Sequence, residues 1–137
     1  MSDRTFTPEQ VDALIPTLSE LMGTAMERHQ QASALGQALH EERERIRVSG
    51  GGLIDQREWK ARAERLDGLG IEVRGALQQV LDLGGVTKDL DLGLVDFPGH
   101  VATAGDELVN LCWKYGEPAV RFWHRFDEGY AQRRPLP

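Results

Sequence analysis

Residues 94–125 read LVDFPGHVATAGDELVNLCWKYGEPAVRFWHR, and within this stretch the apolar pattern changes from helical to alternating. Residues 109–114 and 119–124 alternate with period two, and residues 115–118 contain Gly and Pro. Such runs around a Gly/Pro turn predict an antiparallel hairpin. The stretch also holds the only cysteine and two of the three tryptophans. We therefore expect a functional site here.

The register of this hairpin decides which side chains can meet. A four-residue loop pairs Leu111 with Phe122 and Val109 with His124, which places Cys112 and His124 on opposite faces of the sheet. A metal needs both ligands at roughly 2.0–2.3 Å. A thiolate–imidazole pair needs hydrogen-bond contact. In this register Cys112 and His124 cannot meet, so we expect no metal ligand and no catalytic residue.

A third strand is predicted at residues 94–97, ended by Pro98. If Val95 and Phe97 face the core, Asp96 lies on the opposite face. The residues expected beside it there are Asn110, Cys112, Arg121 and Trp123. An alternative needs no ligand: Asp96 and Arg121 form a cross-strand ion pair, and a tryptophan covers the arginine stem.

Two long amphipathic helices precede the strands. Thr7, Pro8 and Gln10 form a helix start with a capping box, and apolar residues at helical spacing continue over residues 8–48. Residues 49–52, Ser-Gly-Gly-Gly, end this helix, and Asp55 caps a second one over residues 55–83. We expect an antiparallel hairpin with a nearly coiled-coil seam. Because the first helix is longer, its surplus seam predicts a homodimer.

Composition limits the classes of protein. A chain of 137 residues with 16 basic and 22 acidic side chains has a net charge of -6, which argues against nucleic-acid binding. One cysteine cannot form an intramolecular disulfide. The absence of a secretory leader and of about 18 consecutive apolar residues predicts no membrane segment and a cytoplasmic protein.

The predicted fold class is α+β, with one domain over residues 1–137. A long antiparallel helical hairpin packs with a small β-meander at residues 92–125, and a tail follows at residues 126–137. Arg133 and Arg134 in the tail suit a carboxylate or phosphate. If the tail crosses the open sheet face, these arginines reach Cys112 and Trp123.

The residues also carry a family resemblance over nearly the whole chain. LVDFP at residues 94–98, LCW at 111–113 with GE at 116–117, WH at 123–124, and RRPL at 133–136 resemble the signature of bacterial domain-of-unknown-function family 2203. Some members carry a division-initiation-like label. The loop at residues 99–107 departs from the family pattern. The resemblance implies no activity and no known cofactor.

Pattern and resemblance together give one set of candidate ligand-binding residues. They are Asp96, Asn110, Cys112, Glu117, Arg121, Trp123, His124, Arg133 and Arg134.

Two functions remain open from sequence. The first is a non-catalytic module that binds an unknown protein or small molecule. The second is a metal-binding protein or small enzyme using Cys112, His124, Glu117 and Asp96. The second requires a hairpin register that differs by an odd number of residues.

Overall fold

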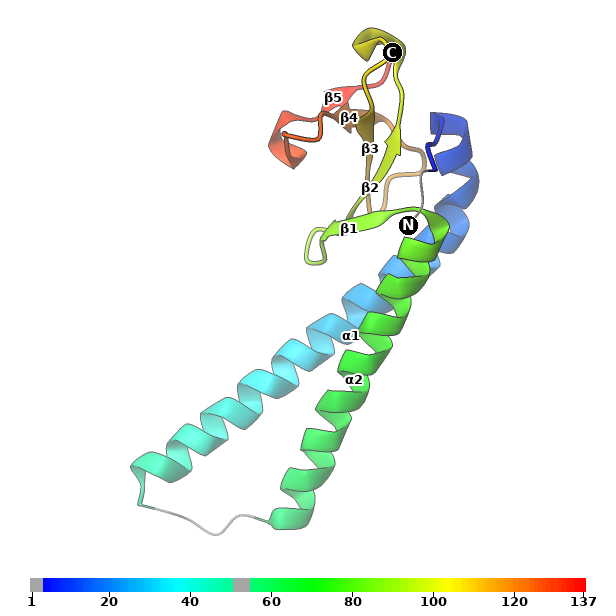
Figure 1. The fold of residues 1–137 in the computed structure, drawn as a ribbon. Helices are drawn as coiled ribbons and strands as arrows, with labels where there is room; N and C mark the ends of the chain where they lie inside the picture. The colour runs from blue at the N-terminus through cyan, green and yellow to red at the C-terminus, as the bar shows by residue number, and fades with distance from the viewer. Residues whose placement is uncertain (1–3, 51–54) are drawn as a thin grey trace.

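The protein is described by a computed structural model that covers residues 4–50 and 55–137. Two long helices form a hairpin that projects away from a small sheet (Figure 1). In chain order the elements are α1 (Pro8–Val48), α2 (Gln56–Leu83), β1 (Val86–Asp89), β2 (Leu94–Gly99), η1 (Ala102–Ala104), β3 (Val109–Lys114), β4 (Phe122–His124), η2 (Tyr130–Gln132) and β5 (Arg134–Pro135). The α+β fold class is confirmed.

The helix termini follow from local chemistry. The Thr7 hydroxyl accepts from the backbone N–H of Gln10, whose side chain accepts from the N–H of Thr7, so the predicted capping box forms. Asp55 caps α2 by accepting from two backbone N–H groups. Gly84 ends α2 at φ 108°, a left-handed conformation that glycine adopts without strain. Of the glycine run expected to end α1, residues 51 and 52 lie outside the described residues.

The five strands form one antiparallel sheet in the order β1-β2-β3-β4-β5. The sequence predicted the middle three. It missed β1 and β5, because their four and two residues are too few to show an alternating apolar pattern. The stretch expected to be a tail therefore folds back, and Trp123 of β4 pairs with Arg134 of β5.

Proline does not end β2 as expected, because the strand continues to Gly99. The carbonyl of Pro98 accepts a hydrogen bond from the N–H of Phe6 at 2.8 Å, which holds the segment before α1 against this edge. A Cβ on Gly99 would lie 2.2 Å from the carbonyl oxygen of Phe6. Only glycine permits this close approach.

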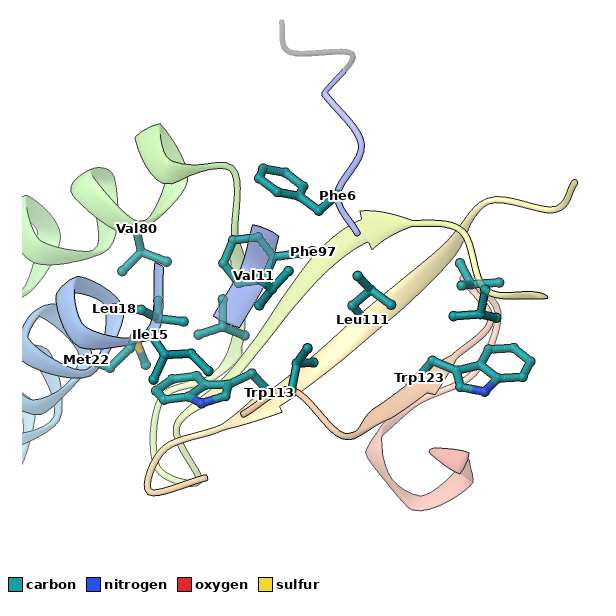
Figure 2. Close-up of a cluster of buried hydrophobic side chains, with 14 residues drawn as sticks. Phe6, Val11, Ile15, Leu18, Met22, Val80, Phe97, Leu111, Trp113 and Trp123 are labelled. Atoms are coloured by element: carbon teal, nitrogen blue, oxygen red, sulfur yellow. The ribbon is translucent and has the colours of Figure 1, made fainter. Parts of the chain in front are cut away.

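The core lies between one face of the sheet and the ends of the helices nearest to it (Figure 2). Trp113 and Phe97 of the sheet are fully buried, as are Leu18 and Met22 of α1. The remainder of the hairpin extends beyond the sheet. Within the described residues, no helix is apolar enough over sufficient length to cross a membrane.

Candidate functional site

The predicted register of the β3–β4 hairpin is wrong by one residue. The observed partners are Asn110 with His124, Leu111 with Trp123, and Cys112 with Phe122. A shift of one residue moves every side chain of β4 to the other face. His124 therefore lies on the same face as Cys112, and Trp123 moves to the core face.

The connection between β3 and β4 explains the shift. Glu117 closes a turn at Lys114, with its backbone N–H donating to the Lys114 carbonyl and its carboxylate accepting from the Lys114 N–H. The chain then runs wide, and the N–H of Val120 donates to Asp12 of α1 at 2.7 Å. Because Val120 bonds to a helix instead of to β3, strand pairing begins later than a four-residue loop allows.

Three buried polar side chains converge on this face, which we call the site face. Asp96 comes from β2, Cys112 from β3 and His124 from β4, and their exposed fractions are 2%, 1% and 3%. One carboxylate oxygen, the Sγ atom and one ring nitrogen all lie within 4.8 Å of one another. Cross-strand pairing of Asp96 with Cys112 brings the first two together.

The hydrogen bonds of His124 fix how its ring is used. Nδ1 lies 2.8 Å from the carbonyl oxygen of Arg125, which accepts a hydrogen bond and so requires a proton on Nδ1. Nε2 lies 3.0 Å from Oδ2 of Asp96. The other oxygen, Oδ1 of Asp96, is buried without a hydrogen-bond partner in the described part of the chain.

Electrostatics keep Cys112 in its thiol form. Burial, with a smaller contribution from the Asp96 carboxylate, raises the pKa of Cys112 from 9.0 to about 12, although Arg133 opposes this change. Burial also raises the pKa of Asp96 above its usual value, while His124 and, more weakly, Lys88 act in the opposite direction. Burial in this environment makes the charged form of both side chains energetically unfavourable.

Arg133 covers the thiol from the C-terminal segment. Its guanidinium lies 3.9 Å from the ring centre of Phe122 and 4.5 Å from that of Tyr130. Both oxygens of Glu117 accept from it, at 3.3 and 3.2 Å. Glu117 therefore compensates the charge of Arg133 and positions it over Cys112.

This geometry does not match a cysteine–histidine nucleophile. In such a pair one ring nitrogen faces the thiol, and the other is held by an orienting group. Here Nδ1 of His124 faces a carbonyl and Nε2 faces Asp96. A raised thiol pKa also disfavours the reactive thiolate.

The same geometry suits a metal ligand set. A histidine ligand commonly donates its second ring N–H to a backbone carbonyl, as His124 does through Nδ1. Ligands of a tetrahedral zinc ion lie roughly 3.3–3.8 Å apart, given the usual bond lengths. Small side-chain rotations bring atoms that are within 4.8 Å to that spacing. Asp96, Cys112 and His124 can therefore hold a divalent transition metal.

The other predicted site residues have different places. Asn110 lies on the site face opposite His124, and Glu117 contacts Arg133 without joining the three ligands. Arg121 is exposed on the wide connection, so the expected Asp96–Arg121 ion pair is replaced by Asp96–His124.

Trp123 and Arg134 lie away from the three ligands. Trp123 is in the core, and the Arg134 guanidinium lies 4.9 Å from its ring centre while pairing with both oxygens of Glu128. The tail thus reaches both Cys112 and Trp123, but on opposite faces of the sheet. Arg133 reaches the thiol, and Arg134 covers the tryptophan.

The sequence interpretation missed Lys88, Phe126 and Tyr130, which line a cavity of about 130 Å³ that opens onto the three ligands. Lys88 belongs to the unpredicted strand β1, and the other two come from the segment expected to be a tail. One signal was available: placing the large Trp123 in the core would have moved His124 to the face of Cys112 and Asp96.

Comparisons with known proteins identify a family and nothing more specific. No curated protein and no solved structure shows significant similarity to this chain. The family model described as "Uncharacterized conserved protein (DUF2203)" matches residues 4–136. Since this match spans nearly all 137 residues, the chain belongs to the DUF2203 family.

Proposed function

We propose that the protein binds a divalent transition metal, with zinc the best fit, through Asp96, Cys112 and His124. The observation that carries the proposal is the buried convergence of a carboxylate, a thiol and an imidazole whose Nδ1 is already held by a carbonyl. The unpartnered Oδ1 of Asp96 supports it, because buried polar atoms rarely lack a partner.

The donor types favour zinc over magnesium or calcium. Thiolate and imidazole are ligands for zinc and other transition metals, whereas the two harder ions prefer oxygen. Three protein ligands leave a fourth position of a tetrahedral ion for water or substrate. All three ligands line the 130 Å³ cavity, which therefore offers space for that water or substrate. This arrangement resembles catalytic zinc sites more than closed structural ones.

Metal binding must displace protons at this site. The Sγ–H proton of Cys112 leaves when the sulfur coordinates the metal. The proton shared by Nε2 of His124 and Oδ2 of Asp96 leaves when Nε2 coordinates the metal. Coordination also stabilises the thiolate despite the low polarity of its surroundings. Metal affinity is therefore expected to rise with pH.

The test is titration of metal-free protein with Co²⁺ and Zn²⁺. Near-stoichiometric Co²⁺ binding should give thiolate-to-cobalt absorption, and calorimetry in buffers of different ionisation enthalpy should detect proton release. Cys112→Ser should remove the absorption, and His124→Gln should weaken binding at least about tenfold. His100→Gln is the matched control, because His100 is an exposed histidine.

Circular dichroism and urea denaturation of each variant establish that its fold is retained. Substoichiometric binding without thiolate absorption, or binding unchanged in Cys112→Ser, would refute the metal site.

We infer a second candidate function, partner binding or homodimerisation through the helical hairpin. It is supported by Ile71 and Leu81 of α2, which are large apolar side chains with 62% and 53% exposure. Light scattering over a range of concentrations tests it. A dimer that Ile71→Glu dissociates would support this function, and a monomer at all concentrations would contradict the homodimer.

A cytoplasmic location is also part of the proposal. Its support is the free, buried Cys112, since a reducing compartment keeps a thiol available as a metal ligand. Localisation of a tagged full-length chain tests this point.

A further inference from the structure

A larger cavity adjoins Asp96, one of the three proposed ligands. Its volume is about 550 Å³, within the range of roughly 300–1,000 Å³ that is usual for small-molecule pockets. It shares four wall residues with the smaller cavity: Lys88, Asp96, Asn110 and Phe126. Because Asp96 is a proposed ligand and belongs to both walls, a molecule in the larger cavity lies next to the metal position.

One part of this cavity is apolar. Val86, Leu108 and Phe126 line it, and they are 42%, 36% and 56% exposed. They make up three of the eight large hydrophobic side chains that are exposed among the described residues. Their clustering in one cavity indicates a surface that an apolar group covers.

The other part carries positive charge. Lys88 lies on β1 close enough to Asp96 to act on its carboxylate. Arg4 also lines the cavity, and its guanidinium is held at the end of α2 by the carbonyls of Asp82 and Leu83, at 3.3 and 2.8 Å. In a metal-loaded site Asp96 is neutralised by the ion. The polar end of the cavity then favours an anion.

We propose that this cavity binds a small amphipathic monocarboxylate. Its carboxylate reaches the open metal position past Lys88 and Asp96, which line both cavities, and its hydrocarbon chain lies along Val86, Leu108 and Phe126. The proposal rests on the metal site and names the ligand class of that site. A primary amine lacks the negative charge that this site requires. A short carboxylate lacks a hydrocarbon chain long enough to contact the apolar side chains.

The test uses the Co²⁺-loaded full-length protein and the series acetate, butyrate, hexanoate and octanoate. Ligation at the metal should change the visible cobalt absorption. Affinity should rise up to about fourfold per added methylene, since each buried methylene contributes about 0.8 kcal/mol. Octanol and octylammonium are the matched probes without the negative charge, and both should bind at least about tenfold more weakly than octanoate.

Exposed residues offer variants that leave the proposed ligands intact. Lys88→Gln should weaken all carboxylates by a similar factor, while Phe126→Ser should reduce the gain with chain length. Val48→Ser is the control, because it removes an exposed apolar side chain from the end of α1, and Val48 lines neither cavity.

The outcomes separate the two proposals. Cobalt absorption that is unaffected by the carboxylates, or equal affinity for acetate and octanoate, overturns the carboxylate site and leaves the metal site standing. Equal binding of octanol also overturns it. Failure of Co²⁺ to give thiolate absorption overturns both.

Discussion

At the middle of strands β2 and β3 both faces of the sheet are buried, but their side chains are chemically opposite. On the core face Phe97 and Trp113 have no exposed surface, and on the site face Asp96 and Cys112 are 2% and 1% exposed. Burial of the first pair is favourable because apolar area leaves water. Burial of the second pair removes hydration from groups whose hydrogen bonds are incomplete. Burial therefore has opposite energetic effects on the two faces. It stabilises the fold on the core face, and on the site face it leaves polar groups available for a ligand.

Different elements cover the two faces. The helices cover the core face, and the C-terminal segment places Arg133 over the thiol on the site face. We expect substitutions on the core face to lower stability and substitutions on the site face to weaken metal binding.

The largest effect is expected from Trp113→Ala on the core face. Removing a fully buried indole leaves a cavity and should lower the free energy of unfolding by about 3–5 kcal/mol. Urea denaturation measures this change, and Ile71→Ala on the exposed face of α2 should change it by less than about 1 kcal/mol. A loss below about 1 kcal/mol for Trp113→Ala would contradict the proposed difference between the faces.

A smaller effect is expected from high pH on the metal-free protein. The folded pKa of Cys112 is about 12 against an ordinary value of 9.0, so the unfolded chain loses this proton first and stability falls as pH rises above about 9. At pH 10 the expected loss is about 1.4 kcal/mol.

Denaturation with a chelator present, at pH 8 and pH 10, measures this loss. The control is Cys112→Ala, in which the part of the pH dependence due to the thiol should disappear. An identical pH dependence in both proteins would show that Cys112 is not protected from ionisation.

The smallest effect on stability is expected from Asp96→Asn on the site face. The amide removes the buried charge, and its N–H group can donate a hydrogen bond to Nε2 of His124, so metal-free stability should change by less than about 1 kcal/mol. Zinc affinity should nevertheless fall at least about tenfold, which calorimetry measures. A large loss of stability with unchanged metal affinity would mean that Asp96 serves the fold and not the site.

The sequence predicted most of the fold because its strongest signals are local. The capping box of Thr7 and Gln10, the cap at Asp55 and helical spacing of apolar residues act within a few turns of chain. The site was predicted less well. Asp96, Cys112 and His124 were all candidates, but the register that unites them depends on a hydrogen bond from Val120 to Asp12, across 108 positions of sequence.

The sequence by itself determined the two helices, the central strands and the residues available for chemistry. Tertiary structure decided which of those residues meet. A strand alternates faces at every residue, so one additional residue in the β3–β4 connection exchanges Trp123 for His124 on the site face. Contacts with α1 and β5 selected that register. The local sequence pattern does not predict the length of a connection that depends on contacts with distant elements.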